Sequence, residues 1–183
     1  MTAKVISSIV EKKLENESIA LNARRSHSSI NPAMPVRVNI ATTDDCNLRC
    51  PTCIFPDHGM HHELSLQDFK EFAKELFPLA REYHTTLLGE PLLTSYFKEI
   101  PHILQQYQMQ MSLVTNGMLL TKDVSNLIMP VLRDIKFSFD GATKQTFERI
   151  RPRSNFETIL ENIKQFLRLR NSSPYRPTAL PNN

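Results

Sequence analysis

Three cysteines carry the clearest chemical signal in this chain of 183 residues. They are Cys46, Cys50 and Cys53, and their spacing is Cys-x3-Cys-x2-Cys. Thiolates are soft ligands that suit iron–sulfur clusters or zinc. Three thiolates on one loop can hold three corners of a [4Fe-4S] cluster, which leaves the fourth iron open to a substrate or cofactor. The spacing therefore favours an iron–sulfur site.

Two other interpretations of the cysteine loop remain open. A closed zinc site needs four ligands, and His58, His61 or His62 could supply the fourth. The chain would then be a Cys3His zinc-stabilised binding module. The cysteines could also be inert thiols, but a disulfide framework is not expected because their number is odd.

Strand and helix patterns alternate on both sides of this loop. Residues 36–40 alternate apolar and polar side chains, which predicts a strand directly before the cysteines. Further strands are predicted at 85–88, 111–114 and 135–139, and helices at 65–77, 95–107, 121–131 and from about 155. Four strand–helix repeats predict an α/β fold of parallel strands.

All four glycines fall in loops that follow predicted strands: Gly59, Gly89, Gly117 and Gly141. In barrel-like α/β folds these loops form the active-site face. Glycine is needed where the backbone turns with a positive φ or approaches a ligand closely. The placement favours a ligand at this edge, although glycine also favours turns in general.

Together with the cysteine loop, three segments resemble the signature of the radical S-adenosylmethionine (radical SAM) enzymes. Residues 89–93 (Gly-Glu-Pro-Leu-Leu) resemble the family's Gly-Gly-Glu-Pro segment, and 115–117 its Thr-Asn-Gly. Residues 137–141 (Phe-Ser-Phe-Asp-Gly) and 147–151 (Phe-Glu-Arg-Ile-Arg) resemble its Ser-Leu-Asp-Gly and Ile-Arg. The resemblance covers roughly residues 36–170. It is greatest to the peptide- and cofactor-maturing (SPASM-type) members.

The resemblance implies a partial TIM-like (β/α) barrel, with about four βα units instead of the usual six. It implies an oxidoreductase that reduces its cluster and cleaves S-adenosylmethionine to methionine and a 5′-deoxyadenosyl radical, which abstracts hydrogen from a substrate. An electron donor such as flavodoxin or ferredoxin is expected. The substrate cannot be identified from the sequence, and a peptide is one candidate.

The resemblance also implies roles for individual residues, with the three cysteines as cluster ligands. The Gly89 backbone and Glu90 would meet the amino group of S-adenosylmethionine. Ser138 would lie near its ribose or carboxylate, and Arg151 would meet the carboxylate. Asn116 would contact the cofactor or support the loop.

Three departures from the family pattern bear on these expectations. Thr52 stands where many members have an aromatic residue near the adenine, and Leu88 replaces the first glycine of the pair before Glu90. Four units are counted where the family has six, and this truncated pattern would leave strand 135–139 an exposed edge. We expect the tail, the N-terminal segment or a partner to cover that edge. A catalytically idle cluster-binding fragment is an alternative function.

Composition and charge set the remaining expectations. Residues 1–35 are predicted to be a polar extension with a short helix or disorder, 36–170 the core, and 171–183 a disordered tail. The net charge is +3, from 22 basic and 19 acidic residues, which favours neither nucleic acid nor a membrane surface. Apolar runs long enough to span a membrane are absent, and a cytoplasmic location is expected.

Overall fold

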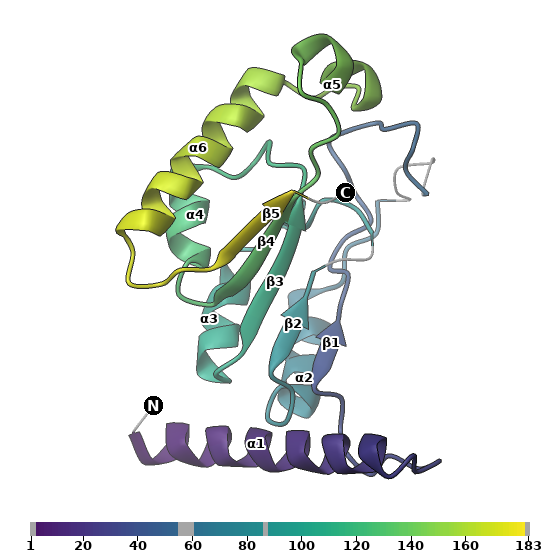
Figure 1. Cartoon of the computed structure of the whole chain (residues 1–183), viewed down its shortest axis with the longest axis vertical. Helices are drawn as coiled ribbons and strands as arrows, with labels where there is room; N and C mark the ends of the chain where they lie inside the picture. The colour runs from purple at the N-terminus through teal and green to yellow at the C-terminus, as the bar shows by residue number, and fades with distance from the viewer. Residues whose placement is uncertain (1–2, 55–60, 86–87, 182–183) are drawn as a thin grey trace.

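The structure is a computed structural model that describes residues 3–54, 61–85 and 88–181. At its centre is a five-stranded sheet of parallel strands, which lie side by side in the order of the sequence (Figure 1). The strands are β1 (Arg37–Asn39), β2 (Glu82–His84), β3 (Gln110–Thr115), β4 (Leu132–Phe137) and β5 (Thr178–Pro181). The predicted class, a partial TIM-like α/β barrel, is confirmed. Strand β2 lies before the predicted segment 85–88, of which residues 86–87 are outside the described residues.

Helices lie on one face of the sheet and at both ends of its strands (Figure 1). They are α1 (Ala3–Arg25), α2 (Leu66–Leu76), the 3-10 helix η1 (Pro91–Leu93), α3 (Glu99–Gln106), α4 (Lys122–Ile128), α5 (Lys144–Ile150) and α6 (Phe156–Ser172). Side chains cap α2 and α4: Ser65 accepts from the N–H of Asp68, and Thr121 from that of Val124. Each cap satisfies an N–H group that the first helical turn leaves without a partner. No helix in the described ranges is long and apolar enough to cross a membrane.

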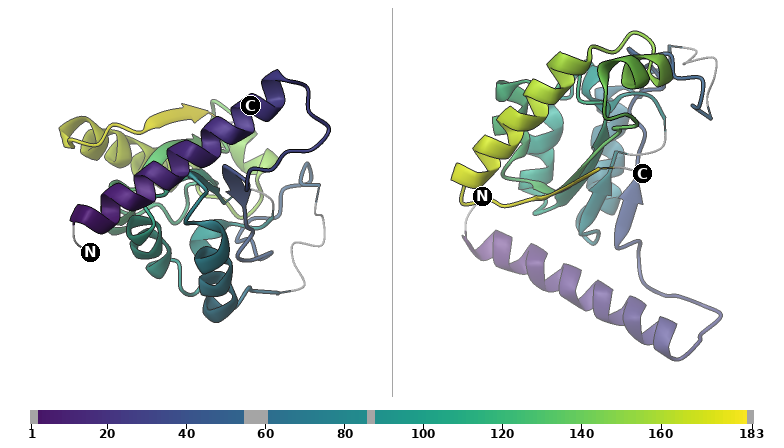
Figure 2. Two further views of the ribbon diagram at one scale, coloured as in Figure 1. Left: turned by 90° about the horizontal axis from the view of Figure 1, so that it is seen from below. Right: turned by 45° about the horizontal axis from the view of Figure 1, so that its top comes forward.

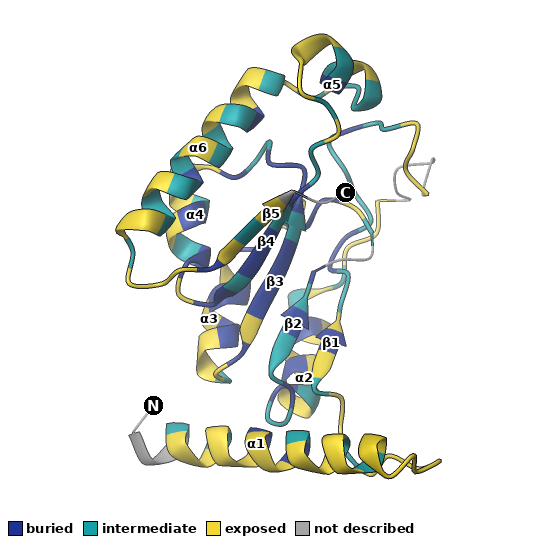
Figure 3. Ribbon diagram, viewed as in Figure 1, coloured by how far each residue is buried: buried dark blue, intermediate teal, exposed yellow. Residues whose placement is uncertain are grey.

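The hydrophobic core lies between the sheet and helices α2, α3, α4 and α6 (Figure 3). Alternate strand residues point into it, among them Tyr83, Met111 and Ile135, each fully buried. Phe69 of α2 packs edge-on against Tyr83, with ring centroids 5.8 Å apart. Burial of one such side chain contributes about 1.5–3 kcal/mol. The core therefore fixes the strand ends that hold the site.

The opposite face of the sheet is polar. Glu82 accepts from Arg37 Nε at 2.9 Å, contacts His84 Nε2 at 3.0 Å and pairs with Arg133. Burial acts to raise the pKa of Glu82, but the His84 and Arg37 hydrogen bonds and the Arg133 charge outweigh it and hold the pKa below its usual value. The neighbouring Asp134 accepts from Ser112 and Arg133. This face thus differs from the packed apolar interior of a complete TIM barrel.

Strand β5 corrects the expectation of a disordered tail. Residues 178–181 pair in parallel with β4, from Asp134 opposite Thr178 to Phe137 opposite Pro181. Helix α6 also continues to Ser172, past the predicted end of the core. The prolines of this segment are compatible with an edge strand, where an N–H group is not always needed. Four strand–helix units are therefore followed by a fifth strand, and the tail covers the edge of β4.

The N-terminal extension is also more ordered than predicted. Helix α1 has 23 residues and lies across the amino ends of the strands (Figures 1 and 2). Polar contacts hold it against the sheet domain: Lys13 donates to the carbonyl of Ala80, and Asn16 to that of Leu79 at 3.3 Å. Asn16 also exchanges hydrogen bonds of 2.9–3.0 Å with the backbone of Met34, between α1 and β1. A helix anchored by polar residues lacks the apolar stripe by which a sequence reveals it.

Because of Lys13, we expect the free energy of unfolding to depend on pH. Burial, and then the Arg81 charge, lowers its pKa from 10.5 to about 8. The unfolded chain therefore binds more protons than the folded one between these values, and the free energy of unfolding should rise with pH there. We expect Lys13→Met to flatten this rise, by about 1–3 kcal/mol over the whole interval. Urea titrations between pH 7.5 and 10.5 measure it.

The exposed neighbour Lys12 provides the matched control. Lys12→Met should leave the pH dependence of the unfolding free energy as it is in the unsubstituted chain. Parallel curves for Lys13→Met and the unsubstituted chain would contradict the prediction.

Candidate functional site

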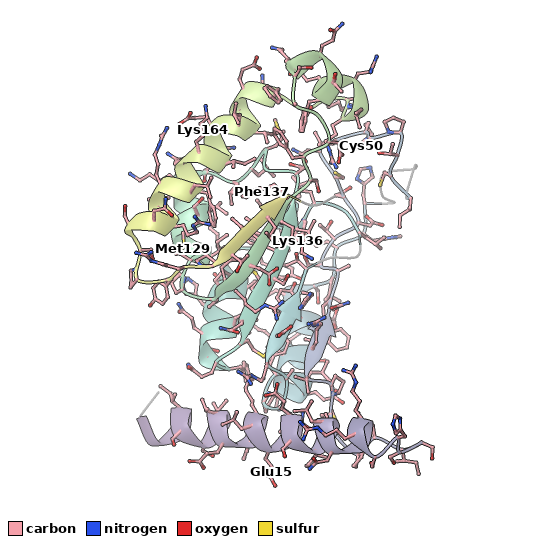
Figure 4. The ribbon with its side chains drawn as sticks, in the orientation of Figure 1. Glu15, Cys50, Met129, Lys136, Phe137 and Lys164 are labelled. Carbon is pink, nitrogen blue, oxygen red and sulfur yellow. The ribbon has the colours of Figure 1, made fainter. Side chains whose placement is uncertain are left out.

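All eight residues singled out from the sequence line one cavity of about 320 Å³. They are Cys46, Cys50, Cys53, Gly89, Glu90, Asn116, Ser138 and Arg151. They come from the segments that follow β1, β2, β3 and β4, together with the end of α5. Carboxyl ends of parallel strands meet at one edge of a sheet, so four distant motifs converge there. Figure 4 shows Cys50 at this end of the molecule, near α5.

The cysteine loop is held by contacts that do not involve sulfur. Arg49 Nη1 donates to the carbonyls of Cys46 at 2.6 Å and Leu48 at 2.7 Å, and its backbone N–H donates to Pro152 at 3.1 Å. Leu48 is buried and anchors the middle of the loop. The cysteines are free thiols, half-buried at 46 and 50 and exposed at Cys53.

Burial raises the pKa of the Cys46 and Cys50 thiols. N–H groups lie against both sulfurs: Arg151 Nη1 is 3.8 Å from Cys50 Sγ, and Asn116 Nδ2 is 4.0 Å from Cys46 Sγ. Such donors stabilise thiolates that bind metal and adjust the reduction potential of an iron–sulfur cluster. Three soft donors in one cavity, two of them with an N–H group against the sulfur, fit a [4Fe-4S] cluster.

Two of the histidines considered as a fourth zinc ligand pair with carboxylates through Nδ1. His61 Nδ1 lies 2.5 Å from Asp45 Oδ1, and His62 Nδ1 lies 3.4 Å from Asp44 Oδ2. His58 lies outside the described residues. Within the described ranges, three or more His, Cys, Asp or Glu side chains nowhere gather around a single metal position. A zinc site needs its ligands around one ion, whereas thiolates of a cluster each bind a different iron. The arrangement favours the cluster.

Glu90 joins the segments that follow β2 and β3. Its carboxylate is buried and accepts from Thr115 Oγ1 at 2.7 Å, the Asn116 N–H at 2.8 Å and the Leu92 N–H at 3.4 Å. Burial raises the pKa of Glu90, while these three hydrogen bonds and the Arg151 charge oppose the rise. Much of its capacity to accept hydrogen bonds is thus used within the protein, which fixes the carboxylate in the cavity wall.

Gly89 is required by a crossing of the chain. Its φ is +64°, and an added Cβ would lie 2.5 Å from the Asp45 carbonyl oxygen and 2.6 Å from that of Thr43. The close approach at Gly89 is therefore to the backbone that follows β1, while Gly89 also lines the cavity. Gly59 lies outside the described residues.

Asn116 and Ser138 complete the rim of the cavity. Asn116 Nδ2 donates to Asn47 Oδ1 at 2.7 Å, and its own Oδ1 accepts from the Met118 N–H at 2.9 Å. Of the two roles predicted for Asn116, the structure thus displays support of the cysteine loop. Ser138 donates its N–H to the Thr115 carbonyl at 3.0 Å, and its half-buried side chain lines the cavity.

Arg151 ends helix α5 and pairs with Asp140. Asp140 Oδ2 accepts from Arg151 Nε at 2.6 Å and Nη2 at 2.5 Å. Asp140 does not cap the helix that follows, because Thr143 does so by accepting from the N–H of Thr146. The sequence pattern therefore located Arg151 and overlooked its partner.

The chain matches the family model of the Radical SAM superfamily over residues 40–182. It belongs to the radical SAM superfamily. The match includes every residue that lines the cavity. It also includes β5, so the fifth strand is part of the family's fold in this radical SAM chain.

Sequence relatives of this radical SAM chain include GTP 3′,8-cyclases. That of Synechocystis sp. is 33% identical over 134 residues, covering 70% of this chain and 40% of the cyclase. That of Peptoclostridium acidaminophilum is 31% identical over 135 residues, covering 70% and 41%. The chain therefore spans about 40% of the length of the curated relatives it matches.

Solved structures agree on the fold. Streptococcus suis SuiB bound to S-adenosylmethionine matches with a TM-score of 0.66 at 13% identity, covering 85% of this chain and 36% of SuiB. The enzyme anSMEcpe, with bound AdoMet and the Cp18Cys peptide, matches with a TM-score of 0.64 at 17% identity, covering 80% and 42%. At these identities the likeness shows that the radical SAM chain shares their fold.

Sequence reasoning missed Arg49 and Asp140 as members of the site. Arg49 lies between Cys46 and Cys50, and a basic residue beside thiols that could bind metal was the signal that could have revealed it. Asp140 lay inside a recognised motif, but its partner is 11 residues away along the chain. Only the path of α5 brings the two together.

Glycine at one position of the loop after α5 is expected to stabilise this radical SAM chain. Arg153 is exposed and has a φ of +72°, a conformation that suits glycine and costs other residues about 1–2 kcal/mol. We expect Arg153→Gly to be about 1 kcal/mol more stable than Arg153→Ala in urea unfolding, since only glycine relieves the strain. Equal stabilities of these two variants would contradict the prediction.

Proposed function

We propose that this chain is the cluster- and cofactor-binding core of a radical SAM enzyme. One observation supports it above all: the residues of four separate motifs line a single cavity at the carboxyl edge of the sheet. Three free thiols, a buried carboxylate and a guanidinium line this cavity together. A zwitterionic cofactor that carries an amine and a carboxylate matches this distribution of charge.

Each group has a proposed task. Cys46, Cys50 and Cys53 would hold a [4Fe-4S] cluster, which supplies the electron that cleaves S-adenosylmethionine to methionine and a 5′-deoxyadenosyl radical. Glu90 and the Gly89 carbonyl would accept from the cofactor's amino group. The remaining rim residues, Ser138 and Arg151, would donate to its carboxylate end, and Asn116 would keep the cysteine loop in place.

The substrate proposal follows the sequence relatives. GTP 3′,8-cyclases are up to 33% identical to this chain, which favours GTP as the first substrate to test. A peptide, as in the complexes of anSMEcpe and SuiB, is the second candidate, because those likenesses concern the fold. A flavodoxin or ferredoxin in a reducing cytoplasm would supply the electron, and such a compartment keeps thiols free.

Electron paramagnetic resonance tests the proposal. The chain is reconstituted anaerobically with iron and sulfide, reduced, and measured with and without S-adenosylmethionine. We expect a [4Fe-4S]⁺ signal that shifts when the cofactor is added, followed by release of 5′-deoxyadenosine. Cys50→Ser should lose the signal, whereas Glu157→Gln, on the exposed surface of α6, should keep it.

The alternatives give distinct results. A cluster signal that ignores the cofactor would support a catalytically idle cluster-binding fragment. Bound zinc without iron or sulfide would support the zinc module. Either result would overturn the proposed function.

A further inference from the structure

Asp140 stands behind the proposed cofactor site, although it does not itself line the cavity. One of its carboxylate oxygens accepts from Nε and Nη2 of Arg151, at 2.6 and 2.5 Å. The third guanidinium nitrogen, Nη1, lies 3.8 Å from Cys50 Sγ in the cavity wall. Asp140 therefore binds the Nε and Nη2 edge of the guanidinium and leaves Nη1 facing the cavity.

Helix α5 holds both members of this pair in place. Arg151 ends the helix, where its N–H donates to the Phe147 carbonyl at 2.8 Å. Phe147 is fully buried and packs against Phe139, with ring centroids 4.9 Å apart, and Phe139 directly precedes Asp140. A Cβ on Gly141 would lie 2.8 Å from the Phe147 nitrogen, so the loop lies directly on the helix. The separation of Asp140 and Arg151 is thus set by packing.

The pair is partly shielded from solvent. The Arg151 side chain is 16% exposed and that of Asp140 is 33% exposed. Among the described residues, Asp140 forms its ion pair with Arg151. The helix-capping role is taken by Thr143. The contacts of Asp140 therefore point to one role, which is to orient the guanidinium of Arg151.

Orientation matters because a free arginine side chain carries about 2 kcal/mol of rotamer entropy. A guanidinium that is already held loses less of it when it binds an anion. S-adenosylmethionine has one anionic group, its carboxylate. We propose that Asp140 is a positioning residue, which holds Arg151 so that Nη1 meets that carboxylate. This inference rests on the proposed function, and it states how the cofactor site would recognise an α-amino carboxylate.

Equilibrium dialysis of labelled S-adenosylmethionine against the anaerobically reconstituted full chain tests the inference. Asp140→Asn should bind about tenfold more weakly, with unchanged iron content and thermal midpoint, as expected when a supporting partner is lost. The concentration of cofactor that shifts the electron paramagnetic resonance signal should rise by the same factor. Arg151→Gln should weaken binding at least as much, and the double variant should bind no more weakly than Arg151→Gln, because Asp140 acts through Arg151.

The matched control is Glu157→Gln, which removes a carboxylate from the exposed ion pair with Lys144 and should bind as the unsubstituted chain does. Asp140→Glu keeps the charge and should bind more tightly than Asp140→Asn. Asp140→Asn within twofold of the unsubstituted chain, additive losses in the double variant, or lost iron in Asp140→Asn would each overturn the inference. An unsubstituted chain that loads iron but does not bind the cofactor would overturn the proposed function instead.

Discussion

Gly89→Ala should lower the free energy of unfolding by about 3–5 kcal/mol, through strain at φ +64° and overlap with two backbone oxygens. The carbonyls of Thr43 and Asp45 that a methyl group would meet cannot rotate away as a side chain could. The Glu90 N–H donates to the Asp45 carbonyl at 2.6 Å, so any separation also breaks that bond. Urea unfolding measures the loss, and iron content after reconstitution measures the damage to the cysteine loop.

Gly117→Ala is the matched control for this prediction. Gly117 also has a positive φ, +81°, but its added Cβ would meet only a methyl group of Ile159, at 3.2 Å. We expect a loss of about 1–2 kcal/mol, because the strain remains while the methyl can move. A loss for Gly117→Ala as large as that for Gly89→Ala would show that backbone overlap is not the cause.

Glu90→Gln should cost about 1–3 kcal/mol of stability, since an amide cannot accept every hydrogen bond that the carboxylate does. If the new oxygen keeps Thr115 Oγ1 and the Leu92 N–H, the new NH2 group faces the N–H of Asn116. The side-chain NH2 group and the backbone N–H are both buried donors, so they cannot form a hydrogen bond with each other. Urea unfolding measures the loss, and the proposed function adds weaker binding of S-adenosylmethionine.

One control and one contrary result test the prediction for Glu90→Gln. Glu157→Gln, at an exposed ion pair, should change stability by less than about 0.5 kcal/mol. A Glu90→Gln variant as stable as the unsubstituted chain would mean that the carboxyl is already protonated and tolerates the amide.

The site was more accessible to sequence reasoning than parts of the fold. Cysteine spacing, Glu90 before a proline and Asn116-Gly117 are local patterns, and parallel strands bring such patterns to one edge. Knowing the strand order was therefore enough to expect one cavity. The contacts within it were not accessible in this way. Arg151 meets Asp140 and Asn116 meets Asn47 through packing of segments far apart in sequence.

The two ends of the chain show a different limit. Helix α1 is anchored by Lys13 and Asn16, polar residues that normally mark an exposed surface. Strand β5 has four residues and ends in proline, so its pairing with β4 outweighs its local preference. In both places tertiary contacts decide the structure, and a single sequence does not display them.

The sequential order of the strands has a consequence for synthesis of the protein. Each strand pairs with the one made just before it, so the sheet can grow as the chain leaves the ribosome. The cysteine loop gains its partners more slowly: first Glu90 on Asp45, then Asn116 on Asn47, and last Pro152 on the loop between the cysteines. The thiols are therefore made before the segments that pack around their loop, and the cavity that they line takes its final form only after α5 has emerged.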